Sequence, residues 1–353
     1  MREWEKNIRR VEPYVPGEQP KEKNIIKLNT NENPYPPSPL VEAASKEIEY
    51  GNYRKYPDPT SDALVSALAE NYGVEKEQIF VGVGSDDVLS MAFLTFFNSD
   101  KPVLFPDITY SFYKVWAQVY KIPYECPALD EDFNIRACDY YGENGGVVIA
   151  NPNAPTGIYR DNDFIRDVLD HNRDVIVVVD EAYIDFAGES AISLLDEYDN
   201  LVVVQTFSKS RSMAGMRIGM AIAGKELIKA MNDVKYSINS YTMNTPSLIL
   251  GTAAANSNDY YRETTAKIIA TRQKTTDRLK ELGFTCLPSG TNFVFARHNR
   301  VKGTDIFNYL RENKVFVRHF NAPRIDDFLR ITIGTDEEME VMFSLLEKYF
   351  DSL

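Results

Sequence analysis

Five short runs of apolar, mostly β-branched residues recur along the first two thirds of the chain. They are IFVGV (79–83), PVLF (102–105), GVVIA (146–150), VIVVV (175–179) and LVVVQ (201–205). Runs this uniformly apolar are typical of strands buried on both faces of a mostly parallel sheet, and helix-like segments lie between them. The sequence therefore predicts an α/β fold.

Each of these runs ends in a polar or glycine-bearing turn. The turns are GSDD, PDITY, NPNAPTG, DEAY and TFSK. Ligands of open α/β sheets bind beyond the carboxyl ends of the strands. We therefore expect the five turns to converge on one site.

The character of the sequence changes after about Pro246. A long polar helical stretch, YYRETTAKIIATRQKTTDRLKELG, precedes the strand-like segments TNFVFAR, VFVRHF and FLRITIG and a helical tail. This mixture predicts a smaller α+β domain at 246–353 after a large domain at 34–245. The Pro-, Asn- and charge-rich segment 1–33 is expected to form an arm or lid that joins the small domain.

Composition argues against large polyanionic partners. With 39 Lys and Arg against 52 Asp and Glu, the net charge is -13, which disfavours binding to nucleic acid or anionic membrane. The N-terminus has no apolar signal region, and no apolar run approaches the roughly 20 residues of a membrane span. Three cysteines without metal-type spacing predict neither a metal site nor a disulfide framework. We expect a cytoplasmic protein.

The segment TFSKSRSMAGMRIG (206–219) combines a lysine with anion-binding groups. A lysine that forms an imine needs a desolvated pocket, and a strand end in the middle of a sheet supplies one for Lys209. Arg217, Ser208 and Thr206 could bind a dianionic phosphate. Taken alone, Lys209 would more often be a solvated surface group, but the whole constellation favours a functional lysine.

Asp180 follows the apolar run VIVVV directly, where an unpaired carboxylate would be costly to bury. A protonated pyridine nitrogen would be a suitable cationic partner. Tyr183, three residues on, could reach the phenolic oxygen of the same ring. A helix N-cap for Asp180 and a packing role for Tyr183 are equally open at this point.

The segment VGVGSDD predicts a strand, a glycine turn and a helix start, with Gly84, Ser85 and Asp86 at the turn. Backbone N–H groups and the positive helix end form a site for phosphate there. In PDITYSFY, Tyr110 could stack on a planar ring. A glycine turn, or one tyrosine among 21, is a weak signal by itself.

These segments together resemble the signatures of the fold-type I pyridoxal-phosphate (PLP) aminotransferases. LNTNENPY (28–35), YRKYPDP (53–59) and FLRITIGT (328–335) are similar to histidinol-phosphate aminotransferases within that family. The resemblance runs from about residue 10 to the C-terminus. It implies a PLP-dependent transferase with a large, mostly parallel sheet domain flanked by helices and a smaller α+β domain.

The resemblance also implies roles for individual residues. Lys209 would be the Schiff-base lysine and proton carrier, Asp180 would contact the pyridine nitrogen and Tyr183 the ring phenolate. The remaining implied cofactor contacts are Gly84, Ser85, Asp86, Tyr110, Asn153, Thr206, Ser208, Arg217 and Tyr56. Tyr56 would reach the phosphate of the neighbouring subunit, so a homodimer with shared active sites is implied.

For the substrate, the resemblance implies that Arg330 grips an α-carboxylate and Arg318 meets the distal anion. Tyr14 would close over the site, near Asn29 and Glu32. The implied reaction is histidinol phosphate with 2-oxoglutarate, in histidine biosynthesis. The alternatives are an aromatic or broad-specificity aminotransferase, a PLP decarboxylase of a phosphorylated amino acid, and a PLP-binding regulator without turnover.

One position departs from the family pattern. Where the family usually has Asn before Pro-Thr-Gly, this chain has Ala154. The amide that would hydrogen-bond the cofactor's phenolate is missing, so that Tyr183 carries the contact alone, or Asn153 or Asn151 reaches in. The loss of one such bond changes energies by about 0.5–1.5 kcal/mol, which predicts an altered imine pKa and not an inactive enzyme.

Overall fold

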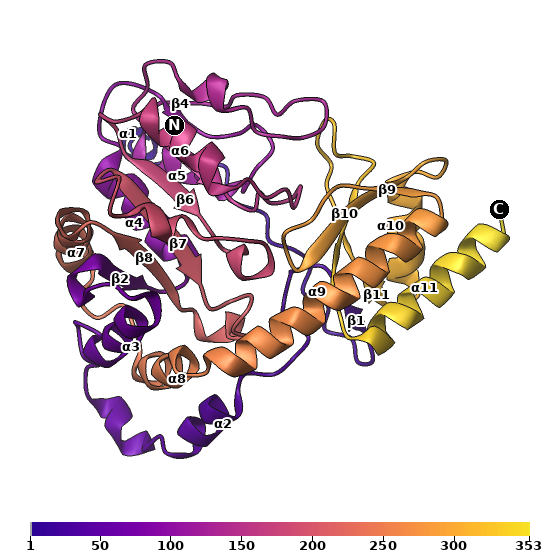
Figure 1. Cartoon of the computed structure of the whole chain (residues 1–353), viewed down its shortest axis with the longest axis horizontal. Helices are drawn as coiled ribbons and strands as arrows, with labels where there is room; N and C mark the ends of the chain where they lie inside the picture. The colour runs from indigo at the N-terminus through magenta and orange to yellow at the C-terminus, as the bar shows by residue number, and fades with distance from the viewer. Residues whose placement is uncertain (1) are drawn as a thin grey trace.

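A seven-stranded sheet forms the centre of the larger of the two bodies in Figure 1. The computed structural model describes residues 2–353, and its sheet has the strand order β2-β8-β7-β6-β5-β3-β4. The strands are β2 (Ile79–Gly82), β3 (Val103–Leu104), β4 (Tyr124–Glu125), β5 (Gly146–Ala150), β6 (Val177–Asp180), β7 (Leu201–Thr206) and β8 (Gly219–Ala223). Strand β8 runs antiparallel to both of its neighbours, β2 and β7, and the other neighbouring strands of this sheet pair in parallel. The prediction of a mostly parallel α/β sheet is confirmed.

Helices cover both faces of this sheet. The α-helices of both bodies, within the described residues, are α1 (Glu3–Lys6), α2 (Pro39–Lys46), α3 (Asp62–Tyr72), α4 (Ser85–Phe96), α5 (Phe112–Tyr120), α6 (Asn162–Asp170), α7 (Lys225–Ile238), α8 (Thr245–Ala255), α9 (Asn258–Glu281), α10 (Gly303–Glu312) and α11 (Asp336–Asp351). Successive residues of β5 point to opposite faces: Val147 packs with Ile165 of α6, and Val148 packs with Phe93 of α4 and Trp116 of α5. Burial on both faces is the physical reason for the uniformly apolar strands.

The smaller body is built on a four-stranded antiparallel sheet with the order β12-β13-β10-β9. Its strands are β9 (Phe284–Cys286), β10 (Phe293–His298), β12 (Arg318–His319) and β13 (Leu329–Thr332). Nearby, β1 (Ile26–Lys27) pairs in parallel with β11 (Val315–Phe316). This pairing attaches the end of the N-terminal segment to the smaller body.

Helix α9 links the two bodies (Figure 1). Tyr261, in its first turn, packs in the same cluster as Leu250 of α8 and Leu64 of α3, whereas Ile268 and Leu279 pack in the core of the smaller body. The boundary expected at 245/246 would place α8 in the small domain. In the structure α8 packs with α2 and α3 on the larger body, because its apolar residues complete their core.

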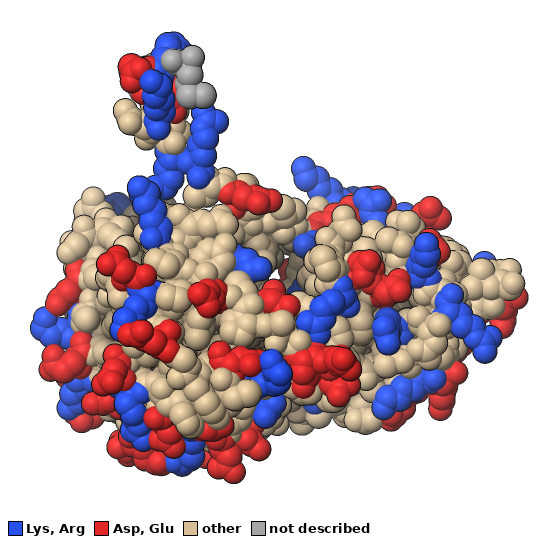
Figure 2. Space-filling model, turned by 90° about the horizontal axis from the view of Figure 1, so that it is seen from above, with Lys and Arg blue, Asp and Glu red and all other residues tan. Residues whose placement is uncertain are grey.

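The N-terminal helix α1 contains no buried residue and projects from the surface in Figure 2. Basic and acidic side chains are intermingled over the face shown there. Within the described part of the chain, no helix combines the length and the hydropathy needed to cross a membrane.

Candidate active site

Two adjoining cavities lie beyond the carboxyl ends of β5, β6 and β7. The inner cavity has a volume of about 250 Å³ and is lined mainly by the larger body. The predicted residues that line it are Glu32, Ser85, Asp86, Tyr110, Asp180, Tyr183, Thr206, Ser208, Lys209, Arg217 and Arg330. The convergence of strand ends expected from the sequence is thus present in the structure.

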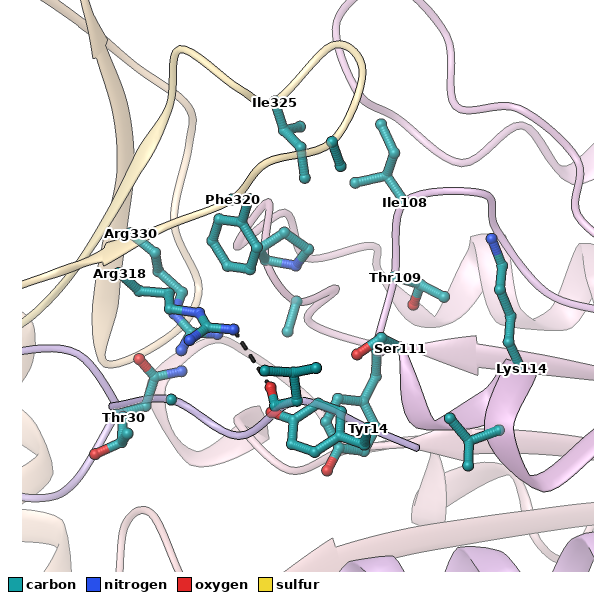
Figure 3. Close-up of a pocket in the computed structure, with 18 of the residues that line it drawn as sticks. Tyr14, Thr30, Ile108, Thr109, Ser111, Lys114, Arg318, Phe320, Ile325 and Arg330 are labelled. Carbon is teal, nitrogen blue, oxygen red and sulfur yellow. Dashed lines mark hydrogen bonds between the residues drawn. The ribbon is translucent and has the colours of Figure 1, made fainter. Parts of the chain in front are cut away.

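The outer cavity, of about 560 Å³, lies between the larger and the smaller body. The predicted residues that line it are Tyr14, Asn29, Tyr110, Tyr183, Lys209, Arg318 and Arg330. In Figure 3, Arg318, Arg330 and Phe320 enter from one side, and Lys114 lies on the opposite side. Lys209 and Tyr183 line both cavities, so the lysine amine lies where the two meet.

Asp180 ends β6 and is 5% exposed. Its carboxylate accepts a hydrogen bond of 2.7 Å from the phenol of Tyr113 and one of 3.2 Å from the backbone N–H of Ala182. Burial raises the pKa of Asp180 to about 6, and the two hydrogen bonds act in the opposite direction. A cation placed beside this carboxylate would favour its charged form, and a protonated pyridine nitrogen is such a cation.

Lys209 follows β7 and points toward the same space. Its Nζ lies 3.5 Å from the carbonyl oxygen of Thr30 and 5.5 Å from the centre of the Tyr183 ring. The lysine, Tyr183 and Asp180 come from two adjacent strand ends, because β6 and β7 are parallel neighbours. A ring compound held by Asp180 would therefore lie within the reach of both the amine and the phenol.

The end of the inner cavity beside the start of α4 carries groups that can bind an anion. Gly84 has φ +84° and precedes α4, and a Cβ at this position would collide with the guanidinium of Arg217. Arg217 Nη1 lies 3.5 Å from Ser208 Oγ, which accepts a hydrogen bond of 3.0 Å from Thr206. The free N–H groups at the start of α4, the guanidinium and the two hydroxyls together fit a phosphate.

Asp86 connects this anion site to the ring site. Its carboxylate accepts hydrogen bonds from Tyr110 Oη at 2.6 Å and from Arg217 Nη2 at 3.1 Å. Burial, followed by the charge of Asp86, raises the pKa of Tyr110, so this phenol stays protonated. Tyr110 also lies 6.4 Å from the ring of Tyr14, which stacks on Phe112 at 4.2 Å. The N-terminal segment thus reaches the outer cavity beside Tyr110.

Two arginines of the smaller body, Arg318 and Arg330, line the outer cavity. Arg318 and Arg330 face each other in the register of β12 and β13. Arg330 Nη2 donates to the Asn29 carbonyl oxygen at 3.1 Å, whereas its buried Nε has no hydrogen-bond partner among the described residues. Burial lowers the pKa of Arg330, and the charge of Arg318 adds to this effect. An anionic ligand would satisfy the free donor and stabilise both cations.

Some predicted residues lie elsewhere. The Asn153 amide bonds Thr109, Thr156 and the Ile108 carbonyl oxygen, and it lines neither cavity. Tyr56 is 80% exposed and stacks on Tyr241 at 4.5 Å, away from both cavities. Its predicted role needs a second copy of the chain.

Neither of the two amides proposed to replace the missing one at position 154 is free. The Asn151 amide is occupied by the backbone N–H and carbonyl oxygen of Arg160, and Asn153 is bonded as described above. Ala154 itself lines both cavities. Among the described residues, this loop therefore supplies no free side-chain amide to either cavity.

The sequence interpretation missed two residues that hold the predicted ones. Tyr113 donates to Asp180, and Asn31 donates to Tyr183 Oη at 2.7 Å. Tyr113 lies in the first turn of α5, three residues after Tyr110, and no local pattern pairs it with Asp180. Asn31 lies between Asn29 and Glu32, which were selected.

Comparisons with known proteins agree with this arrangement. A family model described as aminotransferase class I and II matches residues 23–346. A histidinol-phosphate aminotransferase of Clostridium botulinum (strain Okra / Type B1) is 48% identical over 350 residues, which cover 99% of each chain.

Solved structures have the same fold. The histidinol-phosphate aminotransferase of Sinorhizobium meliloti, in complex with pyridoxal-5'-phosphate, gives a TM-score of 0.83 at 24% identity, with 93% of this chain and 91% of that chain covered. That of Clostridium acetobutylicum gives 0.85 at 21% identity, with coverage of 93% and 100%. At these identities the likeness concerns the fold.

Proposed function

Because this chain belongs to the aminotransferase class I and II family, we propose that it uses PLP to transfer the amino group of histidinol phosphate to 2-oxoglutarate. The observation that carries the proposal is the position of Lys209, between an inner cavity that fits the cofactor and an outer cavity with two arginines. A relative at 48% identity over nearly the whole chain carries the name of this activity.

The inner cavity supplies a contact for each polar group of the cofactor. PLP, when bound, supplies an aldehyde that condenses with amines and a ring that takes up a carbanion's electrons. Asp180 would hold the pyridine nitrogen, Tyr183 the phenolic oxygen, and Arg217 with the start of α4 the phosphate. The raised pKa of Asp180 and the position of Gly84 beneath Arg217 both support this assignment.

Lys209 has two tasks in this proposal. Its amine would hold the cofactor at the aldehyde carbon and would yield this place to the amino group of the donor. The free Nζ would then act as general base and acid, and would take or return a proton at the amino-bearing carbon of the substrate. Its position where the two cavities meet allows contact with both carbons.

The outer cavity would bind the anionic parts of both substrates. Histidinol phosphate carries a phosphate, and 2-oxoglutarate carries two carboxylates, so Arg318 and Arg330 serve either partner. Phe320 and Ile325 provide an apolar wall for an imidazole ring (Figure 3). Tyr14, beside Tyr110, covers the cavity from the N-terminal segment and would exclude water from the reacting atoms.

We also propose a homodimer, as the sequence predicted. Three tyrosines in and after the 3-10 helix η1 (Tyr50–Arg54) are exposed: Tyr50 by 85%, Tyr53 by 56% and Tyr56 by 80%. Aromatic side chains are enriched in protein interfaces, and a second copy would cover this group. The cytoplasmic location also stays a proposal.

Steady-state kinetics with 2-oxoglutarate as acceptor test the substrate assignment. We expect kcat/KM for histidinol phosphate to exceed the values for tyrosine and phenylalanine by about 100-fold or more, because the aromatic acids lack the phosphate. Equal values would favour the aromatic aminotransferase, for which the Phe320 wall is also suited. Carbon dioxide release without a keto acid would indicate a decarboxylase. PLP binding without turnover would indicate a regulator.

A further inference from the structure

A side-chain amide from outside the Ala154 loop contacts the phenol of Tyr183. On the basis of the proposed function, we infer that Asn31 is a positioning residue that fixes the direction in which the phenol of Tyr183 donates its hydrogen bond. Asn31 Nδ2 donates to Tyr183 Oη at 2.7 Å, and Asn31 is 1% exposed. Asn31 belongs to the N-terminal segment and not to the loop that carries Ala154.

The orientation of the Asn31 amide follows from its second partner, Thr332. The backbone N–H of Asn31 donates to Thr332 Oγ1 at 3.1 Å, and this hydroxyl donates to Asn31 Oδ1 at 3.0 Å. If the amide were flipped, its NH₂ group would face Thr332. The buried hydroxyl of Thr332 would then lack a hydrogen-bond acceptor among the described residues. The oxygen of the amide therefore faces Thr332 and its NH₂ group faces Tyr183.

This orientation determines what Tyr183 can do. Its oxygen accepts from Asn31, so the phenol proton is free to point into the cavities that Tyr183 and Ala154 both line. The ring of Tyr183 is only 8% exposed and packs edge-on against Phe293 at 5.3 Å, which restricts its rotation. A hydroxyl that accepts a hydrogen bond is also a stronger donor. One well-directed phenol thus replaces the pair of donors expected from the family.

Asn31 is itself held by the smaller body. It has φ +56°, a left-handed conformation that Asn tolerates, and its carbonyl oxygen accepts a 3.0 Å hydrogen bond from Asn292. Thr332 lies on β13 two residues beyond Arg330, whereas Tyr183 follows β6 of the larger body. The Asn31–Tyr183 bond therefore connects the cofactor end of the site to the strand that carries the substrate arginine.

The test is a pH titration of the visible absorbance of the PLP-loaded protein, without substrate. A donor to the ring's phenolate oxygen stabilises the negative charge left when the chromophore loses its proton, so removal of the donor raises the pH midpoint. We compare wild type with Asn31→Gly, which suits the left-handed backbone, and with Asn31→Asp, which reverses the bond by accepting from Tyr183. Both variants should raise the midpoint by about one unit.

Two further variants separate positioning from general damage. In the Tyr183→Phe protein, Asn31→Gly should cause no further shift, because the phenol through which it acts is gone. Ala154→Asn in the Asn31→Gly protein should restore at least half of the shift by adding a donor from the loop. If the Asn31 variants do not fold, Thr332→Val removes the group that orients the Asn31 amide and should raise the midpoint in the same direction.

The outcomes distinguish this inference from the proposed function. A wild-type protein that forms no visible band with PLP refutes the cofactor assignment and the inference with it. A normal wild-type band whose midpoint is the same in Asn31→Gly, Asn31→Asp and Thr332→Val refutes the inference alone. An equal shift by Asn31→Gly with and without the Tyr183 hydroxyl also refutes it.

Discussion

The substitution Asp180→Asn should stabilise the PLP-free protein although it removes a catalytic group. The carboxyl is buried, and its pKa is raised from 3.8 to about 6, by about 2 units. At about 1.4 kcal/mol per unit, the ionised form costs the folded state about 3 kcal/mol at pH 8. Asn is isosteric, but its single oxygen can keep only one of the two bonds from Tyr113 and Ala182, a loss of about 1 kcal/mol. The net gain at pH 8 is about 2 kcal/mol.

The sign of the pH dependence follows from the direction of the pKa shift. Asp180 has a higher pKa in the folded than in the unfolded protein, so the wild type loses stability as the pH rises from about 4 to about 6 and does not recover it above. The advantage of the Asn variant should therefore be largest at pH 8, begin to shrink below pH 6, vanish between about pH 4 and 5 and reverse at lower pH, where the lost hydrogen bond outweighs the remaining gain.

Urea unfolding of the PLP-free wild type and variant, followed by circular dichroism at pH 4.5, 6 and 8, measures this difference. The exposed Asp174 provides a matched control, since Asp174→Asn should change the free energy of unfolding by less than about 0.5 kcal/mol at each pH. An Asp180→Asn variant that is no more stable than wild type at pH 8, or whose advantage does not depend on pH, would refute the reasoning.

Two further substitutions test the ends of the site. Gly84→Ala places a Cβ against the Arg217 guanidinium and strains a backbone at φ +84°. The affinity for PLP, measured by equilibrium dialysis, should therefore fall about tenfold. A change below twofold would contradict the phosphate assignment. Arg318→Gln removes a charged donor from the outer cavity and should lower kcat/KM for histidinol phosphate about 10- to 100-fold, with the PLP spectrum unchanged. An unaffected kcat/KM would place the substrate anion elsewhere.

The large sheet and the positions of Asp180 and Lys209 could be predicted from the sequence, because all three depend on the local sequence pattern. Apolar runs identify buried parallel strands, and a polar side chain just after such a strand lies at the ligand-binding edge. The antiparallel β8 was not predicted, since its residues GMAIA begin at Gly219, the last residue of the motif used to explain Arg217. Helix α8 begins at the expected boundary at 245/246 but packs with α2 and α3, because the packing partner of an apolar helix is a tertiary property.

The partners of the predicted residues could not be found from local pattern. Tyr113 lies 67 residues before Asp180, and Asn31 lies 152 residues before Tyr183. Only the fold brings such pairs together. Ala154 shows the same limit, because the sequence left open whether Tyr183 acts alone or Asn151 or Asn153 reaches in, and the structure uses the Asn151 amide to bind Arg160 and the Asn153 amide to bind Ile108.

The most direct test of the central claim is the visible spectrum of the PLP-loaded protein after addition of histidinol phosphate without a keto acid, beside samples given tyrosine, phenylalanine or glutamate. The account predicts that the resting band is replaced by that of the amine form of the cofactor, fastest and at the lowest concentration with histidinol phosphate, and that Lys209→Ala does not make this conversion. A spectrum that histidinol phosphate leaves unchanged, or a Lys209→Ala protein that converts as fast as wild type, would contradict it.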